Sequence, residues 1–312
     1  MYDVVGIGAN SVDYVYRLPQ FPRPDGPQAK MRISSHRITC GGQTATALCA
    51  CAALGLRTAY IGATGNDANG HRIRDELARR GVDTHHVVVR DAINPFAVVL
   101  LDDDSGERVV LWDRDQALAL HPGELDPQTI AAARLLHVDD ADPEAAVRGA
   151  AIARRAGIPV TSDLEQVTDR TGELIAAVTV PILAEHLVEP LTGEADVERG
   201  LRKLRREHGG MLCVTRGARG AVLLAGDRLY QEPATPVIVV DTTGAGDVFR
   251  GALIYALLRG DEPAAMLRFA NEAAAISCTR PGAISGVPTL DEVEGLTTKS
   301  TKTSDGQTRH LR

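Results

Sequence analysis

The sequence lacks the cysteine pattern of a disulfide-stapled or zinc-binding protein. Its 312 residues include five cysteines, an odd number, widely spaced and without a Cys-x-x-Cys pair. A disulfide framework normally uses an even set and a zinc site uses closely spaced ligands, so neither is expected. We interpret Cys49 and Cys51 as small buried residues of an alanine-rich helix, in a protein that stays in the reducing cytoplasm.

The chain also lacks an excess of basic charge and a long apolar run. Its formal net charge of −7 is opposite in sign to that of most nucleic-acid-binding proteins, so no nucleic-acid partner is expected. Its apolar runs are shorter than the ~18 residues that span a bilayer. No basic region precedes the first apolar segment. We therefore expect neither a membrane partner nor a secretory signal.

A missing glycine removes a dinucleotide-binding hypothesis. Gly6-Ile7-Gly8 ends an apolar, β-branched segment, which is how such a motif begins. The third glycine of the motif is absent, and Val12 to Tyr16 alternates like a strand instead of opening a helix. The segment therefore predicts the first strand of a parallel sheet without a Rossmann cofactor site.

What the chain does contain is a repeated alternation of strand and helix patterns. Strands are predicted over 58–62, 135–138, 158–161, 180–183 and 211–215, and helices over 70–80, 143–156 and 195–208. Such repeats form a mostly parallel sheet covered by helices on both faces, and ligands bind beyond the carboxyl ends of its strands. The polar residues at or just past predicted strand ends are Asp13, Asp139, Asp163, Thr215 and Asp241.

Additional strand patterns predict a second, smaller sheet. These strands cover about 12–18, 29–38, 96–101 and 107–113. The acidic turn between the last two is interpreted as the solvated tip of a hairpin, in preference to a metal site. We expect residues 1–295 to form one domain, and the polar segment 296–312 to be a disordered tail because it has too few apolar residues to pack.

One stretch, Asp241-Thr242-Thr243-Gly244-Ala245-Gly246-Asp247, carries the chemistry. We predict a buried strand over Val237–Val240 before it and a helix through 251–258 after it. Backbone N–H groups at a helix start lack intrahelical partners, and the small residues 244–246 let an anion approach them. Asp247 would repel a phosphate as a ligand, so its predicted role is to accept a proton from an attacking hydroxyl. The alternative is a helix cap after an ordinary glycine turn.

This stretch, with Gly251-Ala252-Leu253 following, resembles the C-terminal signature of the ribokinase-like (PfkB) carbohydrate kinases, and the resemblance extends from about Val4 to Glu292. It implies a three-layer α/β/α core with a mostly parallel sheet and a small β-sheet lid. It also implies an ATP-dependent kinase that phosphorylates a hydroxyl, a primary alcohol, on a small sugar or sugar acid. Asp247 would be the general base, and Gly244, Ala245 and Gly246 would form the anion hole.

The resemblance also implies where the acceptor binds. Asp13 matches an acid on the lid side that holds substrate hydroxyls, and Gly41 and Gly42 match a pair that holds them through backbone atoms. Asp139 falls where a family acid contacts the sugar. The family motif continues with an asparagine at the position of Thr46, so this chain's sugar-recognition pattern is altered.

For the nucleotide and the metal ions, the resemblance assigns further residues. Thr215 and Gly217, at a strand end and the turn after it, would line the nucleotide site with Asn271 of a long helix. The residues that match the monovalent-cation (K⁺) site are Asp241, Thr243, Ser277, Arg280, Gly282 and Gly286. The family's Asn-x-x-Glu magnesium motif falls on 184–187 and is lost. The neighbouring Glu185 is a candidate Mg²⁺ ligand, or else caps the helix that begins there.

Two other functions fit the same residues. A nucleoside kinase of this fold would need to stack a base, and only 4% of the residues are aromatic, although Trp112 and Phe96 of the lid are candidates for stacking or for filling the lid's apolar face. An inactive sugar sensor would not need to keep Asp247. A small exposed sheet with an apolar face also makes the lid a candidate surface for a homodimer.

Overall fold

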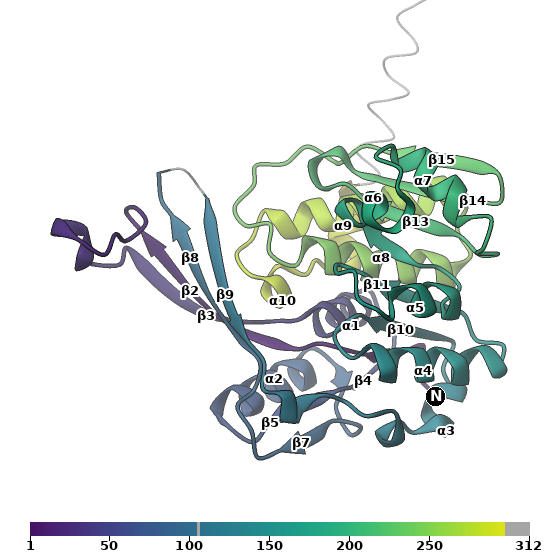
Figure 1. Cartoon of the computed structure of the whole chain (residues 1–312), viewed down its shortest axis with the longest axis horizontal. Helices are drawn as coiled ribbons and strands as arrows, with labels where there is room; N and C mark the ends of the chain where they lie inside the picture. Colours follow the sequence, from purple (N-terminus) through teal and green to yellow (C-terminus); the bar gives the residue numbers. More distant parts are fainter. Residues whose placement is uncertain (105–106, 297–312) are drawn as a thin grey trace, which may run out of the picture.

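The computed structural model describes residues 1–104 and 107–296. Its centre is a parallel sheet in the order β11-β10-β1-β4-β6 (Figure 1). The alternation of strands and helices along the chain therefore gives the predicted parallel core. The strands are β1 (Val4–Ile7), β4 (Thr58–Ile61), β6 (Val82–Asp83), β10 (Leu135–Asp139) and β11 (Val160–Asp163).

A second sheet extends this one in the order β12-β13-β14-β15. Single bridges between Thr161 and Val180 and between Leu164 and Leu183 connect the two sheets. The first pair of the extension is parallel and the other two are antiparallel, so the combined surface is mostly parallel as predicted. The strands are β12 (Ile182–Ala184), β13 (Leu212–Thr215), β14 (Ala221–Ala225) and β15 (Arg228–Glu232).

Two hydrophobic clusters, one on each face of the sheet, make the three layers. Neighbouring strand residues point to opposite faces, so Val4 joins one cluster and Val5 the other. One face is covered by α1 (Gln43–Ala53), α2 (Ala68–Arg79), α8 (Ala245–Arg259) and α9 (Pro263–Cys278). The other is covered by α3 (Pro127–Ala131), α4 (Pro143–Arg155), α5 (Thr171–Ala177), α6 (Val188–Thr192) and α7 (Val197–Leu204).

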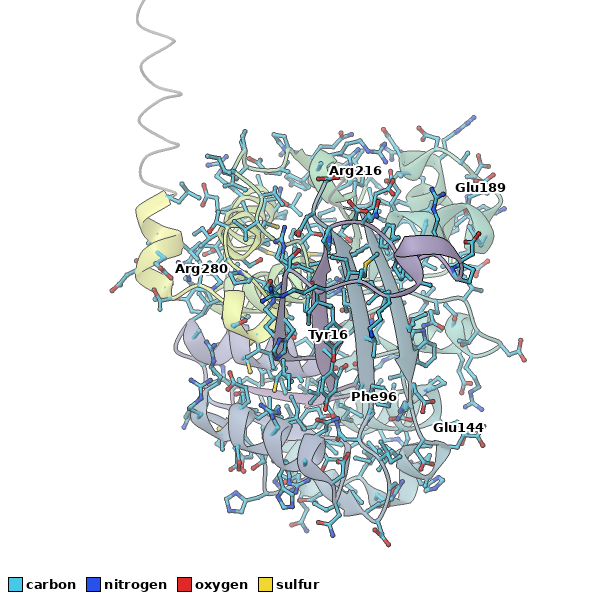
Figure 2. The ribbon with its side chains drawn as sticks, turned by 90° about the vertical axis from the view of Figure 1, so that its left-hand side faces the viewer. Tyr16, Phe96, Glu144, Glu189, Arg216 and Arg280 are labelled. Atoms are coloured by element: carbon cyan, nitrogen blue, oxygen red, sulfur yellow. The ribbon has the colours of Figure 1, made fainter. Side chains whose placement is uncertain are left out.

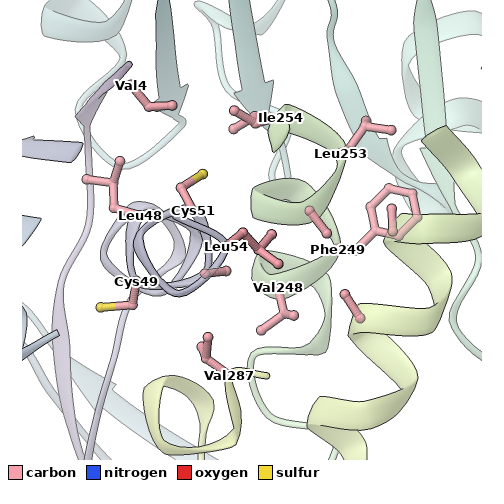
Figure 3. Packing of buried hydrophobic residues seen from close by; sticks show 14 of the residues in the cluster. Val4, Leu48, Cys49, Cys51, Leu54, Val248, Phe249, Leu253, Ile254 and Val287 are labelled. Carbon is pink, nitrogen blue, oxygen red and sulfur yellow. The ribbon is translucent and has the colours of Figure 1, made fainter. Parts of the chain in front are cut away.

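The two helices α1 and α8 cross very closely (Figure 3). A Cβ placed on Gly251 would lie 2.6 Å from the Ala47 carbonyl oxygen and from the Ala50 Cβ, so only glycine fits at the crossing. Cys51 also packs there, with its Sγ 3.5 Å from the Gly251 carbonyl oxygen. Helix packing therefore explains why glycine occupies position 251.

The lid is a four-stranded sheet in the order β3-β2-β8-β9 that projects from the core (Figure 1). Its strands are β2 (Ser11–Leu18), β3 (Ser35–Gly41), β8 (Phe96–Asp102) and β9 (Arg108–Asp113). A separate pair, β5 (Ala63–Gly65) and β7 (Val88–Arg90), lies below it. The strand expected over 29–38 was placed too early: β3 begins only at Ser35, and of residues 30–34 the Ser34 amide donates to the Arg17 carbonyl of β2 at 2.8 Å without extending the strand.

The register of the lid decides which side chains face the core. Arg37 reaches Asp241 of the core, and residues two apart or directly paired share a face. Thr39, which is paired with Asp13, therefore faces the core. The residues paired in sequence across the sheet from Asp13 to Trp112 face the core as well. Phe96 lies on the opposite face of the lid (Figure 2). Its ring is edge-on to that of Tyr14, with ring centroids 6.3 Å apart, so it packs within the lid and faces away from the core.

The strand predicted over Val237–Val240 is wrong. The segment has no regular structure, and Ile238, Val239 and Val240 are 88%, 57% and 54% exposed. The Val240 and Asp241 amides both donate to the Cys278 carbonyl, so the segment is held to the end of α9 and not to a neighbouring strand. An apolar run mimics a buried strand in sequence, but here Val237 and Val239 line a cavity instead.

Two expectations fall partly outside the described residues. These are the acidic hairpin tip at 102–106 and the disordered tail at 296–312. The last described residues, 290–296, are helical. None of the described helices combines the length and apolarity that a bilayer crossing requires.

Candidate active site

The predicted anion loop opens α8 as expected. Gly244 adopts a left-handed conformation with φ of 78°, and a Cβ there would lie 2.5 Å from the Ala283 Cβ of α10 (Ala283–Gly286). The helix starts at Ala245, and Asp247 lies in its first turn with 9% of its surface exposed. The Ala245 amide donates to the Thr242 carbonyl at 3.3 Å, whereas the next amides of this first turn, those of Gly246 and Asp247, have no intrahelical acceptor and are available to an anion.

A buried arginine lies one turn after Asp247. The Arg250 Nη2 is 2.6 Å from the Asp163 Oδ1, and the two side chains are 1% and 0% exposed. Glu165 is also close, with its Oε1 3.9 Å from the same nitrogen. Carboxylate oxygens of Asp163, Glu165 and Asp247 all lie within 4.8 Å of one another. The end of β11 and the start of α8 thus bring three carboxyl groups and one guanidinium group together.

Burial dominates the electrostatics of this group. Desolvation raises the pKa of Asp247 far above that of an ordinary carboxyl group, Arg250 opposes the rise, and Glu165 adds to it. Desolvation also raises the pKa of Asp163. A carboxyl group with a raised pKa holds a proton more readily, which suits a residue that must accept one.

A cavity of about 530 Å³ lies against the anion loop. Three residues predicted for the nucleotide, Thr215, Gly217 and Asn271, line it together with Ala245 and Gly246. The Asn271 amide donates to the carbonyls of Glu232 and Pro233, which holds the end of β15 against α9. The volume is in the range of small-molecule sites. The predicted nucleotide residues are therefore brought together beside the loop.

The predicted acceptor residues Asp13, Gly41 and Gly42 meet at the base of the lid. A Cβ on Gly41 would lie 3.1 Å from the Asp13 Oδ2, and Gly42 has φ of 99° with Asn10 backbone close against it. Asp13 is 8% exposed and accepts a hydrogen bond from the Ser11 hydroxyl at 2.7 Å. Burial raises the pKa of Asp13.

Asp139 and Thr46 are fully buried, unlike the other predicted acceptor residues. The Asp139 carboxylate accepts hydrogen bonds from the Ala9 amide, from the Thr44 amide and hydroxyl, and from the Ala141 amide, so it ties β10 to the start of α1. Burial raises its pKa to about 6. In this arrangement neither residue faces the cleft, and direct contact of either with a substrate stays a prediction.

The residues predicted for a monovalent cation gather around one loop. Burial opposes ionisation of Asp241, but hydrogen bonds from the Thr243 and Gly282 amides, at 2.9 and 2.8 Å, hold its pKa below the usual value. A Cβ on Gly286 would lie 3.1 Å from the Ser277 carbonyl oxygen and 3.8 Å from that of Arg280. Two backbone oxygens therefore converge next to Gly286.

Glu185 is placed away from the acidic group. It begins a 3-10 turn over Glu185–Leu187, and its carboxylate pairs with Arg219. Sequence reasoning missed Glu165 and Arg250. Asp163 had been recognised at a strand end, so the Asp-x-Glu spacing was visible, and Arg250 follows Asp247 by one helical turn.

Lid arginines reaching the loop were also missed. Arg37 Nη2 lies 2.6 Å from the Asp241 Oδ2. Arg108 Nη1 lies 3.3 Å from the Thr242 hydroxyl oxygen and 3.4 Å from that of Thr243. The core-facing side of the lid therefore touches the segment that leads into the anion loop.

Comparison with known proteins identifies similar sequences along nearly the whole chain. A family model described as pfkB family carbohydrate kinase matches residues 1–290. An ATP-dependent ribose-1-phosphate kinase from Halopiger xanaduensis is 31% identical over 94% of this chain and 97% of its own length. A nucleoside kinase from Methanothermobacter thermautotrophicus is 28% identical over 93% and 94%, respectively.

Solved structures show the same fold. A ribokinase from Thermotoga maritima matches with a TM-score of 0.85 and 24% identity, over 96% of this chain and 100% of that chain. A structure from Escherichia coli in complex with ATP and Mg²⁺ matches with a TM-score of 0.83 and 22% identity, over the same shares. The fold is therefore the ribokinase-like α/β fold.

Proposed function

The chain belongs to the pfkB family of carbohydrate kinases, and on that premise we propose that it transfers the γ-phosphoryl group of ATP to a primary hydroxyl of a small sugar or sugar acid. The observation that carries the proposal is the position of Asp247, a buried carboxylate in the first turn of α8, directly beside the anion loop and a nucleotide-sized cavity.

In the proposed reaction, ATP lies in the cavity lined by Gly217 and Asn271. The hydroxyl of the acceptor attacks the γ-phosphorus while Asp247 takes its proton, and the O–P bond to ADP breaks. The amides of Gly244–Gly246 and the positive end of α8 stabilise the charge on the transferred group. A bound Mg²⁺ would neutralise phosphate charge, and the carboxylate oxygens of the acidic group are the donors this ion prefers.

The lid supports the acceptor in this proposal. Asp13 would bind sugar hydroxyls with its carboxylate, and Gly41 and Gly42 with their backbone. The contacts from Arg37 and Arg108 to the 241–243 segment keep the lid over the cleft, which limits the access of water to the γ-phosphate. Because the Ser277 and Arg280 carbonyls converge, we also propose a K⁺ site there, tested by comparing rates in KCl and NaCl.

The test is the Asp247→Asn variant. We expect turnover to fall by roughly 10²–10⁴-fold, the usual contribution of a general base, while ATP still binds. Turnover is followed by ADP release and by phosphorylated product, and ATP binding by calorimetry. Asp196→Asn, which alters the cap of α7, is the matched control and should leave turnover unchanged. Unchanged turnover in Asp247→Asn would contradict the proposal.

A nucleoside is the second candidate acceptor. Trp112 is on the core-facing side of the lid and 71% exposed, and it lines a cavity of about 540 Å³ with Arg114, His121 and Glu144. Such a ring is able to stack on a base. A panel of sugars, sugar acids and nucleosides, read by phosphate transfer, separates the two classes. The absence of transfer to every acceptor would favour an inactive sensor.

The lid also offers a surface for a second copy of the chain. Ile38, Val109 and Leu111 share its outer face and are 39%, 42% and 57% exposed. We propose a homodimer through this face. Sedimentation of the wild type and of Leu111→Glu tests it: the wild type should sediment as a dimer and the variant as a monomer.

A further inference from the structure

The acidic group beside Asp247 includes a carboxylate with no assigned role. Glu165 follows β11, and one of its oxygens lies 4.0 Å from the point where a Cβ of Gly246 would stand. It is therefore next to the anion loop, where the phosphates of a nucleotide would lie. Its side chain is 48% exposed, unlike that of its neighbour Asp163, which is 0% exposed. Glu165 is thus the accessible member of the pair.

The backbone of Glu165 is held from two sides. The Asp140 Oδ2 accepts hydrogen bonds from the amides of Glu165 and Gln166, both at 2.8 Å. The His186 Nε2 lies 2.9 Å from the Glu165 carbonyl oxygen. Asp140 follows β10 and His186 follows β12, so both neighbouring strand ends fix this loop. The carboxylate is consequently presented to the cleft from a constrained backbone.

Behind Glu165, buried polar atoms are left without partners. Neither oxygen of Asp163 accepts a hydrogen bond of acceptable geometry from a described residue, even though Arg250 Nη2 is 2.6 Å away. The Arg250 Nε is likewise unpartnered among the described residues. Three carboxyl groups therefore share one guanidinium among the described residues. A divalent cation beside the exposed carboxylate of Glu165 would add the positive charge that this group otherwise receives from Arg250 alone.

The residue expected from sequence does not fit this task. Glu185 is engaged by Arg219 and lies outside the three-carboxylate group, which is the one such group among the described residues. The Asn-x-x-Glu positions themselves are Ala184 and Leu187, which have no side-chain oxygen. Mg²⁺ at a nucleotide usually keeps several waters and needs only one or two protein carboxylates. One accessible carboxylate beside the phosphates meets that need.

We propose that Glu165 is the residue through which this chain holds the divalent cation of its nucleotide, in place of the missing motif glutamate. Asp163 and Arg250 are positioning residues that set the charge behind it, and Asp247 remains free to act as the base. This inference rests on the proposed function, in which ATP is the phosphoryl donor.

The test measures metal binding directly on the full chain. Mn²⁺ is titrated into the protein saturated with β,γ-imido-ATP and followed by electron paramagnetic resonance. We expect Glu165→Gln to weaken Mn²⁺ binding by about tenfold or more, in the range seen when metal-site residues are altered. Glu185→Gln is the matched control, since it removes one carboxylate from the same rim, and it should bind Mn²⁺ like the wild type.

The outcomes separate this inference from the function. If Glu165→Gln binds Mn²⁺ as tightly as the wild type, or if Glu185→Gln is the variant that weakens binding, the inference is overturned while phosphoryl transfer by the wild type still stands. If the wild type neither binds the ATP analogue nor phosphorylates any acceptor, the function fails and takes the inference with it. Thermal unfolding confirms that each variant is folded, and Glu165→Asp should retain part of the Mn²⁺ affinity.

Discussion

Arg250 and Asp163 form a buried ion pair, with the Arg250 Nη2 2.6 Å from the Asp163 Oδ1, between α8 and the central sheet. Arg250→Ala would leave Asp163 buried and uncompensated, so we expect a loss of about 3–5 kcal/mol in the free energy of unfolding. Urea denaturation measures it. Arg202→Ala, which breaks an exposed pair with Glu198 on α7, is the control and should cost less than about 1 kcal/mol.

A second pair of substitutions separates lost charge from lost packing. Replacing both partners, Arg250→Met with Asp163→Leu, removes the charges together and should recover much of the stability lost in Arg250→Ala. Catalysis should not recover, since the charge pattern beside Asp247 is gone. Equal stability of the single and double variants would contradict this account.

Gly246 is required because of the position of Arg250. A Cβ at Gly246 would lie 2.5 Å from the Arg250 Nη1, and the buried ion pair prevents that side chain from moving away. We expect Gly246→Ala to lower both the melting temperature and the turnover. The control is Gly172→Ala in α5, where a Cβ meets nothing within 4 Å and alanine favours a helix. It should be neutral or slightly stabilising.

The pH dependence of the reaction should reflect the raised pKa of Asp247. Burial causes the rise, and a base must be ionised to accept a proton, so kcat/KM should fall with decreasing pH well above the usual carboxyl pKa of about 3.9. A raised pKa in the folded state also means that ionisation of Asp247 lowers the free energy of unfolding. The stabilisation provided by the protonated group is complete below the pKa of the unfolded state and is lost as the pH rises through the pKa of the folded state.

It follows that Asp247→Asn should unfold at a higher temperature than the wild type at neutral pH, although it is inactive. The same comparison below the unfolded carboxyl pKa should show little difference, because both side chains are then neutral. A variant less stable than the wild type at neutral pH would contradict the assignment of a buried carboxyl group with a raised pKa at this position.

The contact between Arg37 and Asp241 should help to keep the lid over the cleft. We expect Arg37→Ala to raise the KM for the acceptor and to increase ATP hydrolysis without an acceptor, because water gains access to the γ-phosphate. Arg17→Ala removes another lid arginine, one paired with Asp103 within the lid, and should change neither quantity. Product and phosphate release distinguish transfer from hydrolysis.

Sequence patterns predicted those parts of the site that are contiguous in the chain. The anion loop and Asp247 occupy neighbouring positions, so their local geometry follows from one glycine turn and one helix start. The parallel core likewise follows from repeated strand and helix periods. The Glu165–Arg250 contact joins positions far apart in the chain, and only the tertiary structure brings them together.

The two errors in strand placement have a common cause. Val237–Val240 is apolar and β-branched, and 30–34 alternates, but a strand also needs a neighbouring strand to pair with along its length, and neither segment has one. The pairing of Glu185 with Arg219 could not be predicted either, because proximity to a motif position in sequence does not reveal which side chains meet in the fold.

The close crossing at Gly251 has a mechanical consequence. The helix that begins after Gly42 and the helix that carries Asp247 are in direct contact there, so the proposed acceptor site and the proposed general base lie on two tightly packed helices. A movement of the lid would therefore change how the site is covered, without moving these two helices relative to each other. In the proposed reaction the core would align the attacking hydroxyl, and movement of the lid would only open or close the site.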